Sequence, residues 1–148
     1  MTPAPGYSGT PLARKLGIVA GGHVHAAGAP DDYLHWLAPL PDGVAWLDRA
    51  DARADLVHVF HTRADALHAD LVRLRAALRE DAMLWVSWPK KSARVATDIT
   101  EDTIRALALP LGFVDTKVCA VSEVWSGLKL VVRKELRGSR RPQAPGRR

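Results

Sequence analysis

The clearest pattern of hydrophobic and polar positions lies between Asp55 and Lys91. Two apolar runs, LVHVF and MLWVSW, flank a segment of mixed polarity. That segment has leucines at intervals of four, three and four residues, at Leu67, Leu71, Leu74 and Leu78. The spacing predicts an amphipathic helix, and the two runs predict strands that are buried on both faces. A strand, a helix and a strand in this order are typical of a parallel sheet.

Shorter elements are expected before this unit. Thr10 and Pro11 are good residues to open a helix over LARKL, which Gly17 would end. The segment HVHAAGA predicts a first strand, DDYLHWLAPL a helix that Pro39 stops, and VAWLD a second strand. Thr62 is placed to cap the long helix that follows the next strand.

The C-terminal part of the chain has a different pattern. After a helix that begins near Asp98 and Glu101, with Ile104, Leu107 and Leu111 on its buried side, two apolar runs follow, FVDTKVCAV and LKLVVRK. Only SEVWSG separates them. Such a short loop joins antiparallel strands but not parallel ones. We therefore predict an α/β fold, a three-layer Rossmann-like sandwich whose mostly parallel sheet ends in an antiparallel C-terminal hairpin.

The order of elements from Asp55 to Glu135 resembles the second half of the Rossmann-like methyltransferase fold, in a reduced form. The resemblance implies S-adenosylmethionine as cofactor, with a glycine-rich turn after the first strand and an acid after the second. Gly28 lies in the corresponding turn, AAGAPDD, and Asp48 ends the second strand. The other glycines of the multi-glycine pattern are missing.

The segments GYSGTPLARKLGI, DLVHVF, LWVSWPKK and KVCAVSEVWSGLKLVVRKE also resemble a small bacterial family of unknown function. This resemblance covers nearly the whole chain except its C-terminal tail. It implies a compact Rossmann-like domain and supplies no substrate, cofactor or catalytic residue.

Composition limits the class of protein. The 148 residues are 47% hydrophobic and 25% charged, which is typical of one globular domain, assigned here to residues 1–136. No apolar run is long enough to cross a membrane, the N-terminal residues lack a signal-peptide pattern, and Cys119 is the only cysteine. These features predict a cytoplasmic protein with no membrane partner and no internal disulfide.

The net charge of +5 comes entirely from the C-terminal tail. Residues 1–136 have equal numbers of basic and acidic side chains, whereas residues 137–148 contain five arginines and no acid. The composition of this tail predicts disorder. A basic tail of this kind either binds nucleic acid through its phosphates or is a solvated end.

Ligands of open α/β sheets bind beyond the carboxyl ends of the strands. His61, Thr62, Trp88, Lys90 and Lys91 are expected there. The two lysines would attract an anion, Trp88 would offer an aromatic surface, and His61 would serve as a general base or bond a loop carbonyl.

Other candidate chemistry is weaker. Of the six histidines only the pairs His23/His25 and His58/His61 lie close in sequence, and on a strand the second pair faces opposite ways, so no metal site is predicted. Cys119 lies in an apolar strand without a placed base. Trp125, expected in the hairpin loop, would contact a ligand or pack over the sheet.

Three functions follow from these observations. The first is a non-catalytic Rossmann-like domain that binds a small anionic ligand or a protein partner at the carboxyl-end crevice. The alternative is an S-adenosylmethionine-dependent methyltransferase with a degenerate cofactor motif, using Gly28 and Asp48. The third is nucleic-acid binding through the tail. Ala27, Ala29 and Pro30 allow fewer backbone conformations in this turn than glycines would. This favours the non-catalytic binding domain over the methyltransferase.

Overall fold

The structure is a computed structural model, and it describes residues 10–138. Six strands form one sheet in the order β2-β1-β3-β4-β6-β5. The strands are β1 (His23–Ala27), β2 (Ala45–Trp46), β3 (Leu56–Phe60), β4 (Met83–Pro89), β5 (Phe113–Ala120) and β6 (Trp125–Val132). The first four run parallel, and β6 pairs antiparallel with both β4 and β5. The predicted α/β fold with its terminal hairpin is confirmed.

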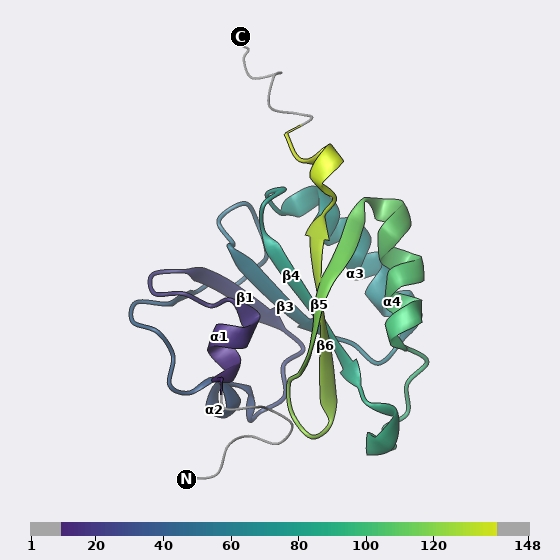
Figure 1. Cartoon of the computed structure of the whole chain (residues 1–148), viewed down its shortest axis with the longest axis horizontal. Coiled ribbons are helices and arrows are strands. Elements are labelled where there is room, and N and C mark those ends of the chain that lie inside the picture. Colours follow the sequence, from purple (N-terminus) through teal and green to yellow (C-terminus); the bar gives the residue numbers. More distant parts are fainter. Residues whose placement is uncertain (1–9, 139–148) are drawn as a thin grey trace.

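Helices cover the two faces of this sheet (Figure 1). The α-helices are α1 (Leu12–Leu16), α2 (Tyr33–Leu37), α3 (Ala64–Ala77) and α4 (Glu101–Ala108), and the short 3-10 helices are η1 (Lys91–Ala93), η2 (Leu109–Leu111) and η3 (Lys134–Leu136). α1 and α2 pack on one face and α3 and α4 on the other, with a separate hydrophobic cluster beneath each pair. The three predicted layers are therefore present.

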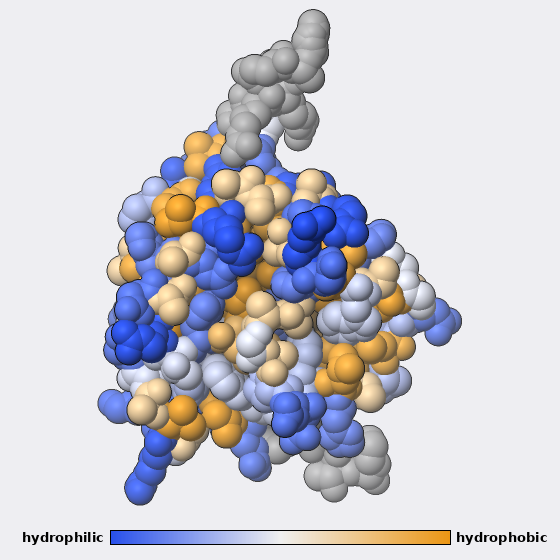
Figure 2. All heavy atoms as spheres, turned by 180° about the vertical axis from the view of Figure 1, so that it is seen from behind, coloured by the Kyte–Doolittle hydropathy of each residue, from blue (hydrophilic) through white to orange (hydrophobic). Residues whose placement is uncertain are grey.

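The face under α3 and α4 is aliphatic. Leu67, Leu71 and Leu74 of α3 are fully buried against alternate residues of β3 and β4, as the leucine spacing predicts. Seen from outside, hydrophobic and hydrophilic residues interleave over this side of the molecule (Figure 2). The helices thus present one apolar side to the sheet and a mixed surface to the solvent.

The caps of α1 and α3 differ from the prediction, whereas α4 begins where it was expected, at Glu101. The N-cap of α1 is Pro11 rather than Thr10, and the N-cap of α3 is Arg63 rather than Thr62, with no side-chain cap bond at either. The N-cap of α4 is Thr100, whose side chain and that of Thr103 form a capping box. In α3 the backbone N–H of Ala64 donates to the Asp98 carboxylate at 2.7 Å, so a side chain distant in sequence replaces the expected local cap.

The second strand and the hairpin loop also differ from the prediction. β2 contains only Ala45 and Trp46, because the chain leaves the sheet before Asp48. Trp125 begins β6 instead of lying in the loop, which is confined to residues 121–124. The predicted disordered tail falls mainly on residues 139–148, which lie outside the described residues. Gly138 still donates from its backbone N–H to Glu80 at 2.9 Å.

Candidate functional site

The carboxyl ends of β1 to β4 lie along one edge of the sheet, because these strands are parallel. α2 and η1 lie at this edge, which is the lower one in Figure 1. The residues after the four strands include most of the predicted site. They are Gly28 after β1, Asp48 after β2, His61 and Thr62 after β3, and Lys90 and Lys91 after β4.

Gly28 forms the turn that follows β1 at this edge. Its φ is +74°, a left-handed conformation that glycine adopts without strain. A Cβ atom at this position would lie 2.9 Å from the backbone oxygen of Phe60 at the end of β3. Glycine is therefore required both by the backbone conformation and by the close approach of the neighbouring strand.

Asp48 follows β2 after one intervening residue. Its side chain is 88% exposed, and a carboxylate oxygen lies 3.7 Å from the guanidinium of Arg53. An ion pair between exposed groups at this distance contributes little to stability, so the carboxylate remains open to a ligand.

Trp46 is a residue of this edge that sequence reasoning missed. It is 40% exposed and makes an edge-to-face contact with Tyr33 of α2, with ring centroids 6.4 Å apart. Its position two residues before Asp48, on the last strand of the sheet, could have indicated a partly exposed aromatic side chain.

His61 and Thr62 are both held by hydrogen bonds. Nε2 of His61 lies 2.8 Å from the Asp70 carboxylate on α3, and both side chains are largely buried. Burial raises the pKa of Asp70, but hydrogen bonds from His61 and Arg73 outweigh it and leave the pKa below its usual value. The Thr62 carbonyl accepts from the Thr97 hydroxyl at 2.7 Å, so a later loop covers the end of β3.

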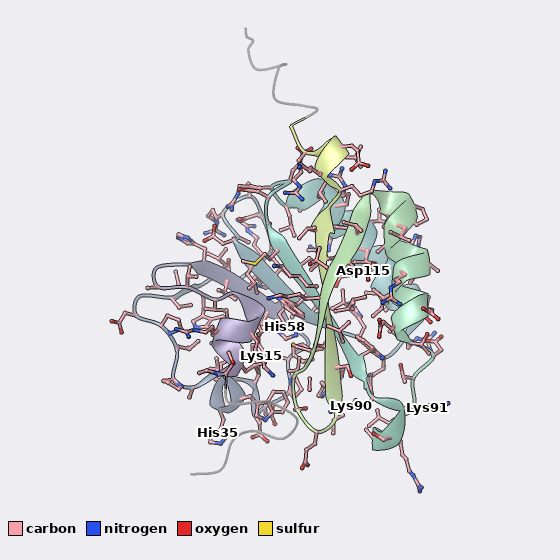
Figure 3. All side chains as sticks on the ribbon, viewed as in Figure 1. Lys15, His35, His58, Lys90, Lys91 and Asp115 are labelled. Atoms are coloured by element: carbon pink, nitrogen blue, oxygen red, sulfur yellow. The ribbon has the colours of Figure 1, made fainter. Side chains whose placement is uncertain are left out.

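Trp88 does not offer the aromatic surface that its sequence position suggested. It is 7% exposed and packs in the cluster under α3 and α4, because alternation along β4 turns its side chain to that face. Lys90 and Lys91 lie beyond the end of the strand, at the start of η1 (Figure 3). The backbone N–H of Lys90 donates to the Val124 carbonyl at 2.7 Å, which ties this corner to the hairpin loop.

A buried hydrogen-bond chain lies under α2, next to this edge. The Tyr33 hydroxyl is 2.8 Å from Nδ1 of His58, and Nε2 of His58 is 2.7 Å from the Ser87 hydroxyl. Burial lowers the pKa of His58 to about 3 and raises that of Tyr33, so both groups are neutral in the folded chain near pH 7. The prediction that His58 and His61 face opposite sides of the sheet is correct, since His58 contacts α2 and His61 contacts α3.

Two hollows lie away from this edge. One of 600 Å³ is bordered by α1, residues 17–20 and residues 39–41, and one of 320 Å³ by Glu80, Asp81, Arg137 and Gly138. Both are near the amino ends of the parallel strands. In residues 10–138, no three His, Cys, Asp or Glu side chains come together as a metal site would need. No helix of the same residues is long and apolar enough to span a membrane.

Comparison with solved structures gives the type of fold. The chain superimposes with a TM-score of 0.57 and 13% identity on an S-adenosylmethionine-dependent methyltransferase from Aquifex aeolicus, covering 82% of this chain and 88% of that one. A putative type 11 methyltransferase from Sulfolobus solfataricus gives a TM-score of 0.57 at 12% identity, with 83% and 90% coverage. The chain has a methyltransferase-type Rossmann-like fold.

A third similar structure is a larger protein. The O-methyltransferase NcsB1 from neocarzinostatin biosynthesis, in complex with S-adenosylmethionine and 2-hydroxy-5-methyl naphthoic acid, gives a TM-score of 0.61 at 15% identity. The match covers 86% of this chain but only 53% of NcsB1. The sequence matches no protein-family model and none of the curated proteins. At these identities the likeness concerns the fold.

Proposed function

We propose that the chain is an S-adenosylmethionine-dependent methyltransferase that binds its cofactor along the carboxyl edge of β1, β2 and β3. Two kinds of observation support the proposal. The fold is shared with methyltransferases, including one in complex with S-adenosylmethionine. In addition, two of the positions that would hold such a cofactor have suitable residues, Gly28 and Asp48.

The geometry of Gly28 is the observation that carries the proposal. Its positive φ and its close approach to the Phe60 carbonyl require glycine, so the turn after β1 presents backbone without a side chain. A cofactor chain could pass against bare backbone at this point, which is the use of glycine at nucleotide-binding turns. Alanines stand at positions 27 and 29, where the full motif would have glycines, but position 28 itself keeps its glycine.

Asp48 would supply the second contact. An exposed carboxylate after the second parallel strand is suited to accept hydrogen bonds from the two ribose hydroxyls. The partly exposed ring of Trp46 lies just before it and would offer an apolar surface to the adenine. Bound cofactor would supply an electrophilic methyl group, and the side chains after β3 and β4 would border the methyl acceptor.

Calorimetric titration with S-adenosylhomocysteine tests the cofactor site. We expect saturable binding to the natural chain and clearly weaker binding to Asp48→Asn, because the amide carries no charge and accepts fewer hydrogen bonds. Asp42→Asn is the matched control, since Asp42 is an exposed aspartate just before β2, at the opposite edge of the sheet. No binding at millimolar ligand, or equal weakening in both variants, would exclude this site.

A second candidate function is recognition of a small anion or of a protein partner at Lys90 and Lys91, without catalysis. One observation favours it: within residues 10–138, neither lysine has a carboxylate partner, although both lie at the carboxyl edge. Replacing both with glutamine should abolish the binding of inorganic phosphate in the same calorimeter. Unchanged phosphate affinity would rule out this corner.

A further inference from the structure

The β5–β6 hairpin has one face that no helix of residues 10–138 covers. Leu128 and Leu130 of β6 point toward α3 and α4 and join the aliphatic cluster. The alternate residues, Gly127 and Lys129, therefore point to the opposite face, the one viewed in Figure 1. In that view α1 lies beside the hairpin, and neither β5 nor β6 has a helix in front of it.

An irregularity in β5 brings a second lysine to this uncovered face. Asp115 pairs with Leu130, and its carboxylate accepts a hydrogen bond at 3.0 Å from Arg105 of α4. Regular alternation would place Lys117 on that same side. The register shifts between Asp115 and Lys117, however, so that Lys117 pairs with Lys129 and lies on the uncovered face with it. Bulges re-aim side chains in this way.

The two lysines are directly opposite each other across the antiparallel pair. Like charges in such positions repel and destabilise a sheet. Partial burial and the charge of Lys117 both lower the pKa of Lys129. No carboxylate forms an ion pair with either side chain in the described part of the chain. The fold therefore holds two ammonium groups close together where repulsion is not compensated.

A third lysine approaches from α1. Trp85, the β4 partner of Lys129, donates its indole N–H to the Leu16 carbonyl at 2.8 Å, which fixes the end of α1 beside β6. Burial raises the pKa of the Cys119 thiol, and the charges of Lys15 and Lys117 act against that effect, so both lysines lie near Cys119. Lys15, Lys117 and Lys129 thus surround one patch, hereafter the lysine face.

We propose that the lysine face binds the phosphate backbone of a single-stranded nucleic acid. Two ammonium groups that are opposite each other without a carboxylate partner in residues 10–138 suit the repeated charges of an extended polyanion. Trp125 lies on the same side of β6 as Gly127 and Lys129, about 13 Å from Lys129 along the strand. Its ring is partly exposed and packs edge-to-face against Phe60, with ring centroids 5.1 Å apart. Cationic and aromatic side chains along one surface are typical of single-strand binding.

The C-terminal sequence agrees with this occupant. β6 leads through η3 into residues 137–148, which contain five arginines and no acid. All of the excess positive charge of the chain therefore follows the strand that carries Lys129. The proposal extends the proposed function by naming a class of partner, but it does not depend on cofactor binding and would stand if that function were excluded.

Fluorescence anisotropy with labelled polyuridine RNA tests the lysine face at several salt concentrations. The full chain should bind with an affinity that falls as salt rises. Lys117→Gln with Lys129→Gln should lower the slope of log affinity against log salt by about 1.4, since each lost phosphate contact on a single strand contributes about 0.7. Arg49→Gln with Arg73→Gln removes the same charge from exposed positions elsewhere and should leave the slope unchanged.

Several results would overturn the proposal. One is the absence of salt-dependent RNA binding, and another is an equal change of the salt slope in the lysine variant and in the arginine control. A further one is competition by polyglutamate as strong as by unlabelled RNA, which would show that the surface binds acidic proteins. Replacing the arginines at 140, 141, 147 and 148 with glutamine measures the contribution of the tail. If that variant loses all binding while the lysine variant loses none, the lysine face is not the site.

Cys119 gives an independent local readout. It is the only cysteine in the chain and lies beside Lys15 and Lys117. Bound RNA should slow its alkylation by iodoacetamide in the natural chain, and this protection should be lost in the Lys117→Gln, Lys129→Gln variant. An alkylation rate that saturating RNA leaves unchanged would place the nucleic acid elsewhere.

Discussion

The two faces of the sheet are stabilised by different chemistry. Under α3 and α4 the contacts are almost entirely aliphatic, with Leu67, Leu71 and Leu74 against the strands. Under α1 and α2 the contacts include an aromatic cluster and the buried chain of Tyr33, His58 and Ser87. The lysine face belongs to this second side, and Ala29, which follows the Gly28 turn, packs against the same cluster. Aliphatic packing thus provides a stable support, while polar and aromatic groups are concentrated where ligands are proposed to bind.

The largest effect is expected on the aliphatic face. Leu71→Ala should reduce the free energy of unfolding by about 3 kcal/mol, because it removes a fully buried side chain and leaves a cavity. Chemical denaturation measures the loss. Val72→Ala, at an exposed neighbour on α3, is the control and should have a much smaller effect. Similar losses in both variants would contradict the assignment of the buried side of α3.

The second effect is a dependence of the free energy of unfolding on pH, which originates in the polar face under α1 and α2. Burial lowers the pKa of His58 from 6.5 to about 3, so between these values the unfolded chain binds a proton that the folded chain does not. Stability from this group is complete above pH 6.5 and is lost as pH falls. We expect a loss of about 2 kcal/mol between about pH 7.5 and about pH 5.

Denaturation at several pH values checks this expectation. His58→Gln should flatten the slope over that range, although the variant itself is less stable. His35→Gln, which removes an exposed imidazole from α2, is the control. A slope that His58→Gln leaves unchanged would mean that His58 is not held neutral by burial.

The third effect concerns the hydrogen-bond chain itself. Tyr33→Phe should cost about 1.5 kcal/mol, because it leaves a buried nitrogen of His58 without its partner. Ser87→Ala should have a similar cost at the other nitrogen. Since both bonds belong to one network, the double variant should differ from the sum of the single variants. Strict additivity would indicate that the two bonds are independent.

The smallest effect is a gain in stability on the lysine face. Lys117→Gln should raise the free energy of unfolding by about 0.5 kcal/mol, because it relieves repulsion by Lys129 across the strand pair. The gain should diminish at high salt, where charges are screened. A loss of stability would show that the two ammonium groups are compensated by groups other than those described.

The aliphatic side of the fold could be predicted from the sequence because its signal is periodic. The leucines of α3 and the apolar runs of β3 and β4 repeat at the spacing of helices and strands, and each position contributes its own evidence. The terminal hairpin followed from a short loop between two runs. These features depend on residues that are close together in the chain.

The polar side could not be predicted in the same way because its contacts join distant residues. Tyr33 reaches His58 and Ser87 from a helix five residues long. On the aliphatic side the cap of α3 escaped prediction for the same reason, since Asp98 supplies it from a distant loop. Lys117 faces Lys129 only because of the bulge, which alternation alone would not reveal. Trp88 was predicted at the surface because of its neighbours Pro89 and Lys90. The alternation of side chains along β4 buries it instead.

The central claim is that the carboxyl edge of the parallel strands binds a nucleoside cofactor. Backbone-amide NMR spectra of the chain with and without S-adenosylhomocysteine test it most directly. We expect the largest shifts at Gly28, Asp48 and His61, with little change at Gly17 and Gly138 on the opposite edge. No shifts at millimolar ligand, or shifts centred on the hollow beside α1, would contradict it.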